Sequence, residues 1–257
     1  MITTGGSPPD PAPRTGVLDA APAGDVPPSQ PPRRADWVPW LIALAVFAAY
    51  TTISLARYFQ LDPGSWDLGI FTEYVRQLAH LRAPVVNIHG SGFNLLGDHF
   101  QPIVGLIAPV FLLFPSAATL LVVQALLTAV SVIPVSRAAA ARLGTGAGRM
   151  IGAAYGLAWG LQQMIDFDFH EIAFAVPLLA CSLSALSRGK VRAAAVWALP
   201  LVFVKEDQGL TVAAIGILIV VMSRFRARGH RPNRAAIRWG ALLTVWGLAW
   251  SFLAIAV

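Results

Sequence analysis

The chain has 257 residues, of which 56% are hydrophobic and 12% are charged, and its formal net charge is +6. Repeated apolar runs of about 16–20 residues exclude an ordinary water-soluble domain and indicate an all-α, multi-pass membrane protein. We attribute the basic excess to cytoplasmic loops that face anionic lipid, so the expected partner is the lipid bilayer and not nucleic acid. The single cysteine, Cys181, excludes an intrachain disulfide.

The first 36 residues are rich in proline, alanine and glycine, and are predicted to form a disordered cytoplasmic tail. Residues 37–257 are predicted to form the transmembrane domain. Arg33 and Arg34 precede an uncharged run, Trp37–Ala56. Because basic residues stay on the cytoplasmic side, this run is expected to cross the plasma membrane from the cytoplasm outward.

An outer loop is predicted over residues 60–100, with an amphipathic helix over residues 65–82 that lies in the membrane interface. Ser65 is a suitable N-cap for this helix. The polar residues Glu73, Arg76, Gln77 and His80 fall on one helical face. Asp67 projects from the opposite, apolar face, which a purely structural acid in the first helical turn does not explain, and this slightly favours a functional role.

The uncharged run Phe100–Ser136 is too long for one span and barely long enough for two. The basic loop Arg137–Arg149 is expected inside, so a single crossing at Ala117–Ser136 is preferred. Gln101–Phe114 then becomes a short re-entrant or in-plane helix. In the alternative topology Gln101–Phe114 is a full span, and the later loops change sides.

The next unit, Met150–Ser187, consists of two apolar segments around the sequence D-F-D-F-H-E, residues 166–171. Basic residues flank it on both sides, so the acidic hexapeptide is expected outside. Two further spans, at 193–204 and 208–223, place Lys205-Glu206-Asp207 near the same surface. A last span at 239–257 gives about seven spans, and we expect the chain to be the N-terminal part of a longer protein.

Four acidic clusters therefore gather on one predicted face: Asp67, Asp98-His99, residues 166–171, and Glu206-Asp207. Carboxylates and imidazole at alternate positions can bind a divalent cation such as Mg²⁺ or Mn²⁺, and the expected ligands are Asp166, Asp168, His170 and Glu171. Arg76 and Lys205 are candidate phosphate-binding groups. For any one cluster alone, a solvated loop between spans is the simpler interpretation.

Four motifs carry a family resemblance: W-D-L-G-I-F, N-L-L-G-D-H-F-Q-P-I, F-D-F-H-E and V-K-E-D-Q-G-L. Together they resemble the bacterial membrane-protein family known as domain of unknown function 2079, over about Tyr58–Ser223. A wider resemblance is to the C-type (GT-C) glycosyltransferases, which use polyprenyl-phosphate-linked sugars on the outer face. That resemblance implies a GT-C-like fold and an essential acid at Asp67. Leu68 departs from it, because many relatives have a second acid there.

The first functional hypothesis is thus a GT-C-like enzyme that transfers a sugar from a polyprenyl-phosphate donor. In it Asp67 acts as a base or metal ligand, and the residues 166–171 cluster organises a cation and the donor phosphate. The remaining predicted contributors are Arg76, Lys205, Asp98 and His99 in substrate or phosphate binding, with Glu206 and Asp207 in support. The alternatives are an ion-coupled transporter or flippase, with buried acids as ion sites, and a non-catalytic membrane assembly protein.

Overall fold

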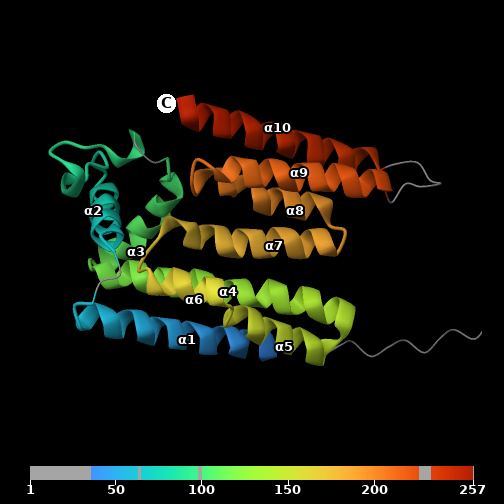
Figure 1. Cartoon of the computed structure of the whole chain (residues 1–257), viewed down its shortest axis with the longest axis horizontal. Coiled ribbons are helices and arrows are strands. Elements are labelled where there is room, and N and C mark those ends of the chain that lie inside the picture. Colours follow the sequence, from blue (N-terminus) through green and yellow to red (C-terminus); the bar gives the residue numbers. More distant parts are fainter. Residues whose placement is uncertain (1–35, 63–64, 98–99, 226–232, 257) are drawn as a thin grey trace, which may run out of the picture. The chain divides into compact units, whose positions relative to one another are not determined.

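Figure 1 shows the computed structural model of the chain. The structure describes residues 36–62, 65–97, 100–225 and 233–256. All regular elements among these residues are helices, without a β-strand, and Val85 and Asn94 form an isolated antiparallel bridge. The predicted all-α class is therefore confirmed for this part of the chain. Apart from Asp36, the predicted disordered tail lies outside the described residues.

Four described helices are long and apolar enough to cross a bilayer: α1 (Val38–Phe59), α4 (Ala117–Leu143), α9 (Gln208–Phe225) and α10 (Arg234–Ala256). Each overlaps a span that the sequence predicts. Trp37 and Trp40 are exposed near the start of α1, as is common for aromatic residues at a membrane interface. The helical membrane architecture follows from these four elements.

The remaining predicted spans are built from shorter elements: α5 (Thr145–Gly156), α6 (Trp159–Asp166), η4 (Glu171–Phe174), α7 (Ala175–Ser187), α8 (Val191–Ala198) and η5 (Leu199–Phe203). The first apolar segment of Met150–Ser187 is not one helix, because the chain breaks at Leu157 and Ala158 between α5 and α6. The expected total of about seven spans stays a prediction, since four helices among the described residues meet the length and composition of a span.

Small residues allow the helices to pack closely. Gly148, Gly152 and Gly156 recur every fourth position on α5, and a Cβ atom added at Gly152 would lie 2.7 Å from Ser136 Cβ on α4. On α9, a Cβ atom at Gly216 would lie 2.6 Å from the carbonyl oxygen of Gly240 on α10. Close backbone approach at glycine is a usual source of helix association in membranes.

The chain turns at two ends of this helix array, which Figure 1 shows as its left and right sides. We call the first the acidic end, defined by residues 57–62, 65–76, 166–171 and 205–207, and the second the basic end, defined by residues 137–149, 188–192, 224–225 and 233–238. Arg57 contacts Asp166 at the acidic end, and Arg149 contacts Asp36 at the basic end. The predicted separation of acidic from basic loops is confirmed, whereas the sidedness of each end stays a prediction.

Helix α2 (Asp67–Ala79) runs across the direction of the long helices at the acidic end (Figure 1). It is shorter than the predicted helix at 65–82, and its N-cap is Trp66 rather than Ser65. Its apolar face packs on η3 (Pro102–Ile107), α3 (Ala108–Leu113) and α4. This face therefore contacts protein, and the η3–α3 segment forms a short apolar helix as expected at 101–114.

Tyr74 is a fully buried residue of α2, and its hydroxyl has no hydrogen-bond partner among the described residues. Burial raises the pKa of Tyr74 to about 12. Because an unsatisfied buried hydroxyl costs about 1–3 kcal/mol, Tyr74→Phe is expected to leave the free energy of unfolding unchanged or to raise it by about 1 kcal/mol. Thermal unfolding in detergent tests this, and a clear loss of stability would show that the hydroxyl has a partner.

Candidate active site at the acidic end

The D-F-D-F-H-E loop is held by a buried glutamine from the N-terminal third of α4. The Nε2 atom of Gln124 donates to the carbonyl oxygens of Asp168 at 2.6 Å and Met164 at 3.1 Å. Its Oε1 atom accepts from the backbone N–H of His170 at 2.8 Å. The side chain is 0% exposed, so these bonds satisfy polar groups that water cannot reach. Gln124 thus fixes the backbone that carries the acidic residues.

Asp168 connects this loop to the start of α2. Its backbone adopts a left-handed conformation with φ of 72°, which aspartate tolerates better than most residues. Its Oδ2 atom accepts from the backbone N–H of Ser65 at 3.1 Å, and the hydroxyl of Ser65 donates to the carbonyl oxygen of Phe167 at 3.2 Å. The loop and the N-terminal end of α2 therefore form one structural unit.

Asp166 is paired with the last turn of α1. The Arg57 guanidinium lies 2.5 Å from Asp166 Oδ1, also donates to the Asp166 carbonyl oxygen at 2.6 Å, and lies 3.5 Å from Asp62 Oδ2. Both carboxylates are largely exposed, so each pair contributes little to stability in isolation. The geometry places Asp166 at the rim of the acidic end.

Glu171 is the more deeply buried of the two buried carboxylates in this loop, with 1% of its surface exposed against 6% for Asp168. One of its oxygens contacts His170 Nδ1, and the other lies 3.2 Å from Lys205 Nζ. Phe71 of α2 packs edge-on against Phe169, with ring centroids 5.2 Å apart, and covers this side of the loop. A buried charge needs such partners, because desolvation without them is costly.

The contacts of Glu171 determine the pKa of its carboxyl group. Burial alone would raise the pKa of Glu171, but His170 and Lys205 outweigh it and hold the pKa below its ordinary value of 4.5. Burial alone would lower the pKa of Lys205, yet Glu171 beside it holds that pKa above 10.5. Both groups lie outside the four candidate spans. The pair is thus charged throughout the neutral range.

A pH dependence follows from the lowered pKa of Glu171. The ionised carboxylate contributes stability above pH 4.5, its ordinary pKa, and this contribution is lost as the pH falls through the lower pKa of the folded state. Between neutral pH and about pH 3, wild type is therefore expected to lose more stability than Glu171→Gln. Unfolding midpoints across this range test the prediction, with Asp207→Asn as the control. Equal acid sensitivity of wild type and Glu171→Gln would contradict it.

Asp67 differs from the acids around it. It is half-buried, and its carboxylate makes no hydrogen bond or ion pair with the described residues, whereas its backbone N–H donates to Ser65 Oγ at 3.2 Å. It shares the inner face of α2 with Phe71 and Tyr74. The helical register of Asp67 with the buried Phe71 and Tyr74 thus matches the predicted one, and the projection of its carboxylate stays a prediction.

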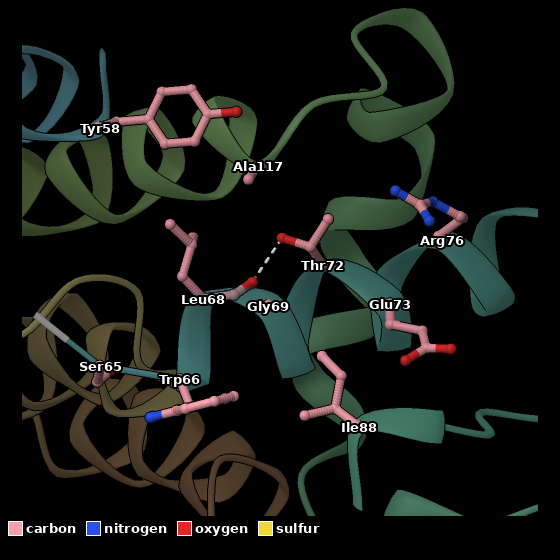
Figure 2. A pocket seen from close by; sticks show the side chains of 10 residues that line it. All are labelled: Tyr58, Ser65, Trp66, Leu68, Gly69, Thr72, Glu73, Arg76, Ile88 and Ala117. Carbon is pink, nitrogen blue, oxygen red and sulfur yellow. Dashed lines mark hydrogen bonds between the residues drawn. The ribbon is translucent and has the colours of Figure 1, made fainter. Parts of the chain in front are cut away.

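Arg76 lies on the other side of α2. It lies nine positions after Asp67 in the helix. This spacing corresponds to two and a half helical turns, so the two residues lie on opposite faces. Arg76 instead lines a groove of about 880 Å³ over the exposed face of the helix, between Trp66 and Ile88 on one side and Tyr58 on the other (Figure 2). The structure thus places the two residues that the sequence assigned to one site on opposite faces of one helix.

The four expected cation ligands do not fit a metal centre in this arrangement. Asp166 pairs with Arg57, Asp168 with Ser65, and Glu171 with His170 and Lys205. Among the residues that the structure describes, no three His, Cys, Asp or Glu side chains form a group that could hold a metal ion. These side chains hold the loop together, and we derive no step through a cation.

The other predicted site residues have separate positions. Asp98 and His99 lie outside the described residues. Asp207 is exposed and its Oδ1 accepts from Gln208 at 3.2 Å, and the carbonyl oxygen of Glu206 accepts from Ser251. Gln124 was missed by the sequence analysis. A lone amide within an otherwise apolar span was the available signal, because such a group must find a partner in the bundle.

Comparison with known proteins gives one family. The family model described as "Predicted membrane protein (DUF2079)" matches residues 57–257, which include every element of the acidic end from Arg57 onward. No curated protein and no solved structure matches the chain. The resemblance to domain of unknown function 2079 is therefore confirmed over most of the chain, and the C-type glycosyltransferase resemblance stays a prediction.

Proposed function

The chain belongs to the DUF2079 family of predicted membrane proteins, and we propose that it is a GT-C-like transferase that moves a sugar from a polyprenyl-phosphate donor. In this proposal the acidic end faces outward from the plasma membrane and the N-terminus is cytoplasmic. The donor lipid reaches the site from the bilayer, at the level where α2 crosses the ends of the long helices.

The observation that carries the proposal is the availability of Asp67. The described acids around it, Asp62, Asp166, Asp168 and Glu171, each have a protein partner, whereas the Asp67 carboxylate makes no hydrogen bond or ion pair with the described residues. A half-buried carboxylate without a competing cation can accept a proton, which is the role of a general base. A carboxylate needed only for folding would be expected to have a partner.

The proposed step uses Asp67 and Lys205. Asp67 takes the proton of an acceptor hydroxyl as that oxygen forms a bond to the anomeric carbon of the sugar. The bond from this carbon to the phosphate oxygen breaks, and polyprenyl phosphate leaves with the electron pair. Lys205, which is 30% exposed and shares one contact with Glu171, stabilises the leaving phosphate. Arg76 has no part in this step because it lies across α2 from Asp67.

The test is a transfer assay on the full-length protein in lipid nanodiscs, with a polyprenyl-phosphate hexose that carries a radiolabel in the sugar. We expect label to leave the lipid fraction and to appear in a water-soluble or acceptor-linked product. Retention of all label in the lipid, with several hexoses and acceptors tried, would contradict the proposal.

A second candidate function, an ion-coupled transporter, draws support from the buried contact of Glu171 with His170 and Lys205. Buried ionisable groups in membrane proteins often carry protons or ions. Proton-gradient-dependent flux in proteoliposomes, without a sugar product, would favour this function over the transferase.

A further inference from the structure

The basic end contains a cavity that neither the transferase nor the transporter function uses. It lies between the start of α8 and the start of α10 and has a volume of about 760 Å³. Lys190 and Arg192 line it from the α8 side, and Asn233 and Ala236 from the α10 side. Trp197 and Trp239 contribute apolar walls. A hollow that combines cationic side chains with apolar walls suits an amphiphile with a negative head.

The charge around this cavity is of one sign. No acidic residue occurs in the two segments that line it, from Gly189 to Trp197 and from Asn233 to Trp239. Lys190 and Arg192 are exposed and make no ion pair within the described part of the chain. Asp36, an acid described at this end, is already paired with Arg149 at 3.0 Å. The cations at the cavity are therefore available to a ligand.

The apolar side of the cavity indicates what kind of anion fits. Trp197 is 46% exposed on the outer surface of α8, and Val196 beside it is 51% exposed. These side chains would contact acyl chains, while Lys190 and Arg192 would contact a phosphate at the level of the headgroups. A free anion would make no favourable contact with the tryptophans, whereas a phospholipid would contact both the cationic and the apolar side chains of the cavity.

We propose that this cavity is a binding site for an anionic phospholipid of the cytoplasmic leaflet, with Lys190 and Arg192 on the phosphate and Trp197 and Trp239 against the acyl chains. The site does not depend on the proposed transferase function, because it lies at the opposite end of the helices. It would fix the loop between α7 and α8 to the start of α10.

The test compares two double variants of the full chain by native mass spectrometry in a neutral detergent, titrated with phosphatidylglycerol and, separately, phosphatidylcholine. Lys190→Gln/Arg192→Gln removes the cavity cations. Arg188→Gln/Arg224→Gln removes two exposed cations of the same end that do not line the cavity. Because each cation near anionic lipid contributes about 1 kcal/mol, the first variant is expected to bind phosphatidylglycerol roughly thirtyfold more weakly.

We expect the control variant to stay within about twofold of wild type and phosphatidylcholine to bind wild type weakly. Equal weakening by both double variants would overturn the proposal, because the attraction would then be diffuse. Equal binding of the two lipids would overturn it as well. Displacement of phosphatidylglycerol by inorganic phosphate alone would show a plain anion site and would also contradict the lipid assignment.

Discussion

Gln124→Leu is expected to lower the free energy of unfolding by about 3 kcal/mol, because it removes the hydrogen-bond partner of one buried and two partly buried backbone groups. These groups are the carbonyl oxygens of Met164 and Asp168 and the N–H of His170. Leucine has a similar size, so loss of packing volume contributes little. Denaturant unfolding in detergent measures the stability, and hydrogen exchange over residues 164–171 measures the local opening.

Gln162→Leu is the matched control for this variant. Gln162 is exposed, and its Nε2 atom donates to the carbonyl oxygen of Leu157 at 2.7 Å. The same substitution there is expected to change stability by less than about 0.5 kcal/mol, since the exposed carbonyl can bond to water. If both variants unfold at the same denaturant concentration as wild type, Gln124 does not hold the acidic loop.

Asp67→Asn is expected to reduce sugar transfer by about 10²–10⁴-fold, the range that a general base usually contributes. Asparagine has nearly the same shape, and the Asp67 carboxylate has no partner among the described residues to lose. Stability is therefore expected to stay unchanged. Initial rates of label release, at saturating donor, measure the effect.

Asp62→Asn serves as the control for charge. Asp62 lies at the same end and is exposed, with its carboxylate 3.5 Å from Arg57. Its substitution removes the same charge without touching the proposed base, so the transfer rate is expected to stay within about twofold of wild type. If Asp67→Asn keeps wild-type activity, Asp67 is not the general base. If both variants lose the same transfer activity, the rate depends on the total negative charge of the acidic end and not on Asp67 in particular.

Local patterns allowed much of the fold to be predicted. The uncharged run Ala117–Ser136 became the core of α4, and the 65–82 pattern became α2, with Tyr74 buried and Arg76 exposed. Hydrophobic length and helical spacing are properties of neighbouring residues, so they can be read from a single sequence. The positions of the basic loops in the sequence likewise predicted which turns lie at the same end of the helices.

The tertiary contacts of the site could not be predicted in the same way. The bonds of Gln124 join residues forty or more positions apart, and the contact of Lys205 with Glu171 joins two loops that were considered separately in the sequence. Periodicity carries no information on such pairs. The expected cation ligands lie close together in the sequence. Their side chains point in different directions, so they contact different partners.

The break at Leu157 and Ala158 was also unpredictable from hydropathy, because the residues on both sides of it are apolar. The last residue of α5 is in close contact with α1: a Cβ atom at Gly156 would lie 2.7 Å from Val46 Cγ2, and the hydroxyl of Tyr50 donates to the carbonyl oxygen of Gly156 at 2.6 Å. The sequence showed the glycines at every fourth position, and their significance depends on which helix lies opposite.

If the acidic end forms one site, all of its loops lie on one side of the membrane, which cysteine labelling in intact cells can measure. On a Cys181→Ala background, single cysteines replace the exposed residues Leu61, Phe167 and Asp207 at the acidic end, and Leu143 at the basic end. We expect an impermeant maleimide to label the first three from outside, and Leu143→Cys after lysis alone. Protection of Phe167→Cys in cells where Leu61→Cys is labelled would place the acids on opposite sides and contradict a single active site.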